Sequence, residues 1–184
     1  PPRSTLFPYT TLFRSRTKIQ NIKNKYPYPD EDGRKYALNA LTWIISSALM
    51  RFNIILALKN HKIKPNVVQR LIGLRKGDLI TALEADLIFT KLSFVSIFQF
   101  QIENLFKIIL SSLNQNKPPQ GYYKIVEKVV TTLDLKDSEK KLETINFLAY
   151  MRNCLHSNGI HTNPSKTFEI EGHKFKFIQG KQYE

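Results

Sequence analysis

The sequence predicts an all-α fold, a helical bundle of four to five main helices followed by a C-terminal β-hairpin. The bundle is predicted because apolar residues recur at helical spacing in several long segments, and because proline and glycine fall between those segments. The hairpin is predicted because the apolar pattern changes to strict alternation after residue 165. A chain of this length can bury a substantial core, and one domain is expected.

The first residues are set aside from the fold prediction. Residues 5–15, TLFPYTTLFRS, resemble the translation of a DNA adapter used in short-read sequencing, and a foreign segment carries no information about the fold. We expect residues 1–15 to pack against nothing specific. Residues 16–33 are interpreted as a linker, so that the domain spans 34–184. Because the chain starts without Met and stops soon after the hairpin, we expect the natural protein to extend beyond both ends.

The first predicted helix spans residues 34–60. It follows Asp30, Glu31 and Asp32, and acidic side chains are favourable near the positive end of a helix dipole. Its uncharged run, Tyr36–Met50, is fifteen residues long. A membrane span needs roughly 20 apolar residues, so we interpret this helix as buried and expect no membrane partner.

The remaining helices are predicted in the stretches that lack internal proline and glycine. Asp137 is expected to cap the last of them, and Gly159 is expected to end it in a Schellman motif. The predicted ranges are 66–74, 78–113 (one long helix or two stacked ones), 122–133 and 138–157.

The hairpin is predicted over residues 167–178. Gly172 and His173 would form its two-residue loop, because glycine at the first loop position suits a type II′ turn. This loop fixes a register that pairs apolar with apolar and acidic with basic residues. The predicted pairs are Ile170–Phe175, Phe168–Phe177, Glu171–Lys174 and Glu169–Lys176.

Basic residues gather in the first half of the chain. Arg3 and Arg14 are the charged residues of 1–15, so the other 169 residues carry 26 basic and 15 acidic side chains, a net charge of +11. Residues 16–76 hold 13 basic and 3 acidic residues, and residues 77–184 hold 13 and 12. A basic half attracts polyanions. The many lysines also fit a chain with A/T-rich codons, and codon bias is the alternative explanation for part of the charge.

The connector between the first two long helices is the candidate nucleic-acid contact. It lacks acidic residues and aromatic rings, so it can follow a backbone but cannot stack bases. The alternative is a solvated loop. The candidate residues are Lys59, Lys62, Lys64, Arg70, Arg75 and Lys76.

Cys154 is the single cysteine, which excludes an intrachain disulfide and indicates a reducing, cytoplasmic setting. Cys154 could join His156, His161 and His173 around a metal ion. Their spacing matches no usual zinc pattern, and a helical cysteine is more often a small core residue. We therefore expect no metal ion and no cofactor.

The densest group of polar residues lies at the end of the last predicted helix. Leu142, Ile145 and Ala149 continue at spacings of three and four into Arg152 and His156, so both side chains share the apolar stripe. Arginine can bind a phosphate, and histidine can exchange a proton with an oxygen near neutral pH. Together they can cleave RNA without a metal, with the 2′-hydroxyl as nucleophile. Alternatively, Arg152 pairs with a carboxylate on a neighbouring helix and His156 caps its own helix.

Glu103 is the candidate carboxylate. It lies among apolar residues of the long predicted helix, which favours a role inside the bundle. Lys107 follows four residues later, and a simple surface ion pair at this spacing would contribute about 0.3–0.5 kcal/mol. Both interpretations remain open.

Arg152 and Asn153, followed shortly by His156 at the end of a helical bundle, resemble the motif of HEPN domains (higher eukaryotes and prokaryotes nucleotide-binding). The resemblance covers roughly Arg34 to Gly159. It implies that Arg152 binds phosphate, Asn153 positions the pair, His156 acts as acid and base, and Glu103 orients Arg152. The gap between Arg152 and His156 is shorter than is usual in the family.

The family also suggests a biological setting. Many HEPN proteins are metal-independent ribonucleases of bacterial toxin–antitoxin and other defence systems, and active members usually dimerise. The resemblance therefore implies an RNA substrate, a homodimer and an antitoxin or other protein partner. The alternative function is a non-catalytic interaction, dimerisation or nucleotide-binding module.

Overall fold

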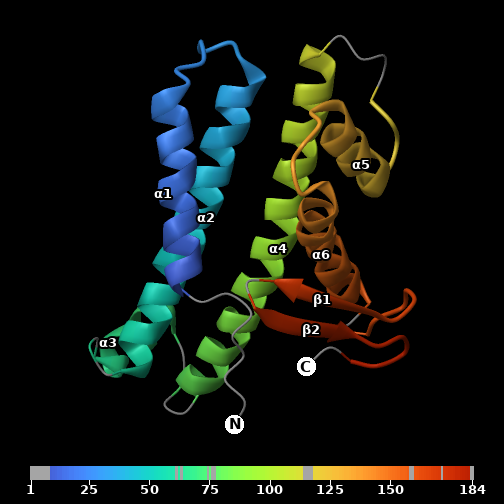
Figure 1. Ribbon diagram of the computed structural model, residues 1–184. Helices are drawn as coiled ribbons and strands as arrows, with labels where there is room; N and C mark the ends of the chain where they lie inside the picture. The colour runs from blue at the N-terminus through green and yellow to red at the C-terminus, as the bar shows by residue number, and fades with distance from the viewer. Residues whose placement is uncertain are drawn as a thin grey trace. The chain divides into compact units, whose positions relative to one another are not determined.

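The segments without internal proline and glycine are helical in the computed structural model of the chain, and the alternating tail is a hairpin (Figure 1). The structure describes residues 9–60, 62, 64–73, 75, 78–113, 118–157, 160–170 and 172–182. The all-α class with a C-terminal hairpin is confirmed. The elements are α1 (Tyr9–Lys25), α2 (Gly33–Lys59), α3 (Pro65–Ile72), α4 (Asp78–Ser112), α5 (Tyr122–Thr132), α6 (Ser138–His156), β1 (Lys166–Ile170) and β2 (His173–Phe177).

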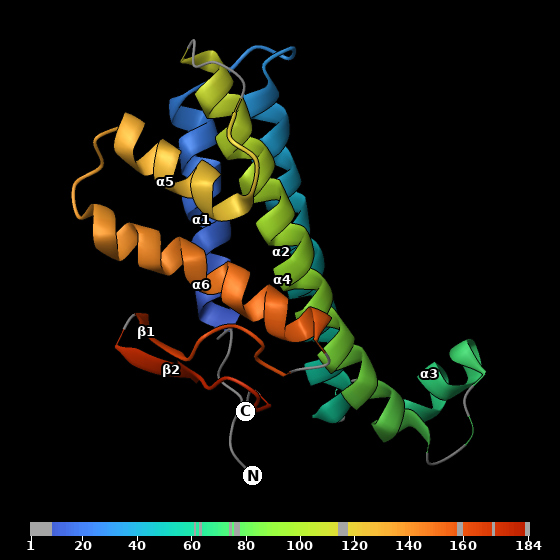
Figure 2. The same cartoon turned by 90° about the vertical axis from the view of Figure 1, so that its right-hand side faces the viewer.

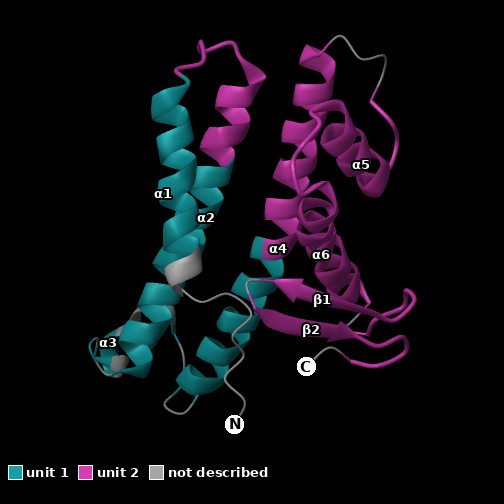
Figure 3. Ribbon diagram, viewed as in Figure 1, with its two compact units in different colours: residues 1–26, 41–94 teal, residues 27–40, 95–184 magenta. Residues whose placement is uncertain are grey.

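The chain divides into two compact units, each described here by itself (Figure 3). Unit 1 comprises residues 1–26 and 41–94, and unit 2 comprises residues 27–40 and 95–184. One part of α2 and one part of α4 belong to unit 1, and the other parts of both helices belong to unit 2. The helices α5 and α6 and the hairpin belong to unit 2.

The helix α1 corrects two predictions about the start of the chain. Residues 9–15 are helical and Leu12 is only 3% exposed, so the expectation that this segment packs against nothing is wrong there. Residues 16–25 continue the helix, and the expected linker is reduced to the stretch between α1 and α2. The physical reason is that α1 contains no proline or glycine, and Leu12 and Ile19 lie on one helical face. Residues 1–8 lie outside the described residues.

The helix α2 has the predicted bounds, but it is buried on one side only. Leu41, Ile45 and Leu49 are buried, whereas Trp43 and Met50 are 64% and 57% exposed. The most apolar 18-residue window has a mean hydropathy of 1.7 and is 33% buried, so by length and composition α2 could also cross a membrane. The prediction of a buried helix is therefore corrected to a helix with one buried face.

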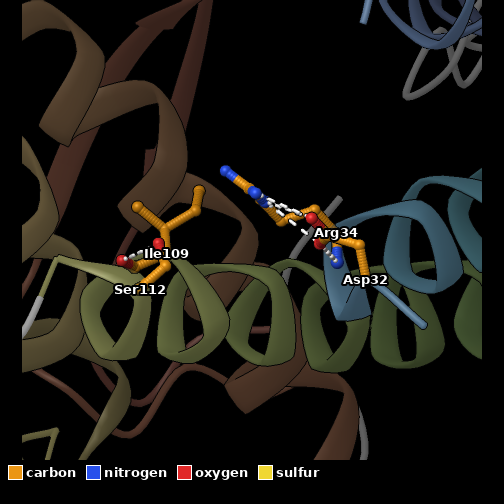
Figure 4. Close-up of polar contacts among 4 residues, drawn as sticks. All are labelled: Asp32, Arg34, Ile109 and Ser112. Carbon is orange, nitrogen blue, oxygen red and sulfur yellow. Dashed lines mark hydrogen bonds and ion pairs between the residues drawn. The ribbon is translucent and has the colours of Figure 1, made fainter. Parts of the chain in front are cut away.

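The start of α2 is fixed by the acidic residues expected there. The Asp32 carboxylate accepts the Arg34 backbone N–H at 2.8 Å and also binds the Arg34 guanidinium, with Oδ2 and Nη2 2.7 Å apart. These hydrogen bonds hold the pKa of Asp32 below its usual value. The backbone at Gly33 lies close to α4, where an added Cβ would be 3.3 Å from Ile108 Cδ1. Figure 4 shows the capped start of α2 beside Ile109 of α4.

The core of unit 2 forms where α5 packs on α6 and on the C-terminal part of α4 (Figures 1 and 2). Phe106 of α4 packs against both clusters of buried residues. The α4 segment is continuous, so the long helix is single rather than two stacked helices. One cluster contains Tyr122, Val126, Val130 and Ala149, and the other contains Leu110, Ile125 and Val129.

The ends of α6 differ in part from prediction. Asp137 precedes the helix as expected, but its side chain makes no cap hydrogen bond because its backbone is left-handed, with φ of 56°. The Asp137 carbonyl accepts the Lys141 N–H at 3.0 Å instead. At the other end, the Ser157 N–H donates to the carbonyl oxygens of Asn153 and Cys154. The predicted Schellman glycine, Gly159, lies outside the described residues.

The hairpin register is two residues away from the predicted one. Phe168 pairs with Phe175, and Ile170 pairs with His173, so Gly172 directly precedes the paired His173. Glu171 of the predicted Glu171–Lys174 pair lies outside the described residues. Gly172 therefore occupies the second loop position, where its φ of 79° suits glycine. The predicted register was wrong because a shift of two residues keeps every side chain on the same face, and the alternation alone cannot detect it.

An aromatic cluster attaches the hairpin to α6. Phe168 and Phe177 are fully buried, and their ring centroids lie 5.5 and 5.9 Å from that of Phe147. Both figures of the whole chain show the strands beside α6 (Figures 1 and 2). The segment that contains the hairpin is also closed at its base, where Ile160 and Gln182 form a β-bridge and the His161 N–H donates to the Lys181 carbonyl.

Candidate functional site

The predicted pair at the end of α6 combines an anchored arginine with an exposed histidine. Arg152 is half-buried, and His156, one turn later, is exposed. Arg152 Nη1 donates to Gln99 Oε1 of α4 at 3.4 Å. Gln99 is 1% exposed, so the half-buried arginine contacts an amide that is held in the core. The pair is thus partly supported by the core and partly accessible.

Glu103 is placed differently from its predicted role. Its carboxylate lies 2.6 Å from Lys107 Nζ on the same helix, so the ion pair at a spacing of four residues is the one that forms. The residue that contacts Arg152 is Gln99, one turn earlier on α4. The sequence analysis missed Gln99. Its only signal was a polar residue on the same helical face as Glu103, inside an otherwise apolar stretch.

Asn153 is half-buried beside Arg152 in the last turns of α6. Its backbone carbonyl takes part in ending the helix by accepting the Ser157 N–H at 3.2 Å. Its position directly after the arginine agrees with the motif.

Two tyrosines at the start of α5 share the electrostatic environment of Arg152. The buried Tyr122 hydroxyl donates to the Ile145 carbonyl at 3.1 Å. Burial raises the pKa of Tyr122, Glu103 raises it further, and the positive charge of Arg152 opposes the shift. Burial and Tyr150 likewise raise the pKa of Tyr123, against the same opposing arginine. The start of α5 therefore lies close to the pair on α6.

Cys154 and His161, two of the residues considered as metal ligands, form a hydrogen bond with each other. Cys154 Sγ lies 3.4 Å from His161 Nδ1, and His161 Nε2 lies 3.0 Å from the Pro164 carbonyl oxygen. Since a carbonyl only accepts, Nε2 carries the proton and the thiol donates to Nδ1. Burial raises the pKa of Cys154, which keeps the thiol protonated. Within the described part of the chain, no three His, Cys, Asp or Glu side chains gather as metal ligands.

The basic connector lies in unit 1, whereas the Arg152 pair lies in unit 2. Its described side chains are exposed, as either a backbone contact or a solvated loop requires: Lys59, Lys62, Lys64, Arg70 and Arg75. Lys76 lies outside the described residues. Lys91 of α4 belongs to the same neighbourhood, because burial and then the charge of Lys59 lower the pKa of Lys91. The sequence analysis did not include Lys91 because it follows the connector by fifteen residues.

No family model, no curated protein and no solved structure matches this chain.

Proposed function

We propose that unit 2 carries a metal-independent ribonuclease site of the HEPN type, in which Arg152 binds a phosphate and His156 transfers protons. The observation that carries the proposal is the arrangement on α6. An arginine anchored by a buried glutamine is followed, one turn later, by an exposed histidine. An anchored guanidinium loses little side-chain freedom when it binds an anion. An exposed imidazole is accessible to the substrate oxygen.

The reaction would be an attack of the RNA on its own backbone. His156 takes the proton of a 2′-hydroxyl, and the oxygen forms a bond to the adjacent phosphorus. The bond from phosphorus to the 5′ oxygen breaks, and that oxygen receives a proton from an imidazolium, either the same one or that of a second copy. The products are a 2′,3′-cyclic phosphate and a 5′-hydroxyl. Arg152 neutralises the charge that develops on the phosphate.

The residues near Arg152 and His156 have different supporting roles in this proposal. Gln99 takes the orienting role that the family motif assigns to an acidic residue such as Glu103, because Gln99 is the residue in contact with Arg152. Glu103 remains close enough to influence the electrostatics of Tyr122. Asn153 would position the backbone of the last turns. In unit 1, the exposed lysines and arginines of the connector are by themselves a candidate contact for nucleic-acid phosphates.

The family resemblance also motivates the proposed setting. It suggests a cytoplasmic protein of a bacterial defence or toxin–antitoxin system, active as a homodimer and controlled by an antitoxin or another protein. The homodimer would bring a second His156 to the site. Analytical ultracentrifugation of the purified protein tests this part, and a monomer at the concentrations of the cleavage assay would contradict it.

Cleavage of single-stranded RNA in the presence of EDTA tests the site. The wild type should release products with 5′-hydroxyl and cyclic phosphate ends, and Arg152→Ala and His156→Ala should each abolish most of the activity. The matched control is His173→Ala, which removes an exposed histidine of the hairpin. Equal activity of wild type and both site variants would remove the assignment.

A second function, a non-catalytic interaction module, is favoured by one specific observation. Trp43, Met50 and Ile54 are exposed large apolar residues at spacings of seven and four on α2. Such a stripe is typical of a surface that packs against another helix. If Trp43→Glu dissociates an oligomer or releases a bound protein while no ribonuclease activity is found, this second function is preferred.

A further inference from the structure

An exposed tyrosine at the start of α5 contacts two other tyrosines, one on α5 and one on α6. Tyr123, the second residue of α5, is 41% exposed. Its ring centroid is 5.9 Å from that of Tyr122 and 6.4 Å from that of Tyr150, with interplanar angles of 80° and 77°. Edge-to-face contacts on two neighbours hold a ring in a defined orientation. Tyr123 is therefore a supported ring with part of its surface open to solvent.

The two supporting rings are themselves fixed. Tyr122 is buried and bonded through its hydroxyl to the carbonyl of Ile145. Tyr150 stacks on His161, with ring centroids 5.4 Å apart and planes 26° apart, and it also contacts Phe168 at 4.9 Å. These contacts connect Tyr123 to α6 and to the hairpin, so its position is set by the core and not by a loop.

Two cations lie on the elements to which this ring is connected. Tyr122 and Tyr123 pack on α6 at Ile145 and Tyr150, in the turns that lead to Arg152, and the positive charge of Arg152 opposes the raised pKa of both tyrosines. Lys166 of the hairpin places its ammonium 5.9 Å from the centroid of Tyr150. An accessible aromatic ring among cations is the combination with which proteins bind single-stranded nucleic acids: the ring stacks on a base, and the cations contact phosphates.

We propose that Tyr123 stacks on a nucleobase of single-stranded RNA whose adjacent phosphate is bound by Arg152. This inference rests on the proposed function, since it assumes RNA at Arg152, and it specifies the substrate as an unpaired strand. In a duplex the bases are already stacked and paired, and their faces are not accessible. Stacking accepts every base, so the site selects unpaired RNA without reading its sequence.

Binding of a fluorescent oligouridine tests this stacking, measured by anisotropy in the His156→Ala background so that the RNA is not cut. Tyr123→Ala should weaken binding by about 5- to 150-fold, the effect of losing one stacked base. Tyr123→Phe keeps the ring and should bind close to the parent protein. The matched control is Tyr36→Ala, which removes another exposed tyrosine of unit 2 and should leave binding unchanged.

An abasic analogue of the same length separates stacking from other losses. The parent protein should bind the analogue more weakly than oligouridine, and Tyr123→Ala should weaken binding of the analogue no further. Equal affinities of Tyr123→Ala and the parent protein for oligouridine would overturn the inference. An equal loss on the analogue would overturn it too, because the effect would not involve a base.

The inference and the proposed function fail separately. If Arg152→Ala and His156→Ala abolish cleavage while Tyr123→Ala binds normally, the ribonuclease proposal stands and the stacking proposal is wrong. If both site variants cleave like the wild type, the ribonuclease assignment is lost, and the comparison of oligouridine with the abasic analogue still decides whether Tyr123 stacks on a base.

Discussion

Replacement of Phe168 by alanine should release the hairpin from α6. Phe168 is fully buried, and its ring lies 4.9 Å from Tyr150, 5.5 Å from Phe147 and 5.6 Å from Phe177 between centroids. Removal of a buried phenylalanine costs about 3–5 kcal/mol. The three ring pairs keep this site from the lower end of that range, since each such pair adds about 0.5–1.5 kcal/mol beyond burial. We expect a loss of about 4 kcal/mol in the free energy of unfolding.

Urea unfolding followed by far-UV circular dichroism measures this loss. With a denaturant dependence of about 1–3 kcal/mol per molar urea, the midpoint should fall by roughly 1–4 M. Phe175→Ala is the matched control, because Phe175 lies on the same hairpin face but is only half-buried. It should cost clearly less. If Phe168→Ala prevents folding, Phe168→Leu provides a milder change. It should still destabilise the protein more than the same change at Phe175.

A loss of less than about 1 kcal/mol in the free energy of unfolding of Phe168→Ala would refute this packing, because removal of a buried ring in such a cluster is expected to cost more. Equal losses for Phe168→Ala and Phe175→Ala would refute the difference in burial between them. Either result would mean that the hairpin does not pack on α6 as described.

Three further predictions concern ionisable groups. Tyr122→Phe should lose about 0.5–1.5 kcal/mol with the hydrogen bond to Ile145. The folded protein raises the pKa of Tyr122, so the wild type should also lose stability as the pH rises above about 10. Tyr122→Phe should lose less stability over the same pH range. Urea titrations at several pH values measure this difference. The folded protein lowers the pKa of Asp32, so the contribution of Asp32 to the stability is present at neutral pH and disappears as the pH falls below about 4. The stability of Asp32→Ala should therefore differ most from that of the wild type at neutral pH. An equal difference at pH 2 would contradict the role of Asp32 as a cap. The Cys154 thiol should react with iodoacetamide far more slowly in the folded protein than in urea, and equal rates would show that the thiol is accessible.

Much of the fold could be predicted because its signals are local. The bounds of α2 and α5 follow from the positions of proline, glycine and the apolar stripe, which act within a few residues. The hairpin faces were predicted for the same reason, but the register was not, since it depends on which loop position glycine occupies. The helix α1 was missed because residues 9–15 were set aside as foreign and residues 16–25 were interpreted as a linker, and an amphipathic segment can pack whatever its origin.

The candidate site was predicted only along its own helix. The stripe that contains Arg152 and His156 follows from spacing within α6. The contact of Arg152 with Gln99 joins residues 53 positions apart, and no local pattern identifies which polar residue of α4 faces the arginine. Tyr123 was likewise not predicted as a site residue, because its role depends on how the start of α5 packs on α6.

The hairpin segment is closed at its base. The chain leaves and returns at the same place, where Ile160 pairs with Gln182 and the Gly180 N–H donates to the His161 carbonyl at 2.7 Å. Length changes between these points therefore do not alter the path of α6. Doubling the length of a flexible loop costs only about 0.6 kcal/mol, so longer or shorter hairpin tips should be accepted. A tag placed at the hairpin tip should therefore leave the helices intact.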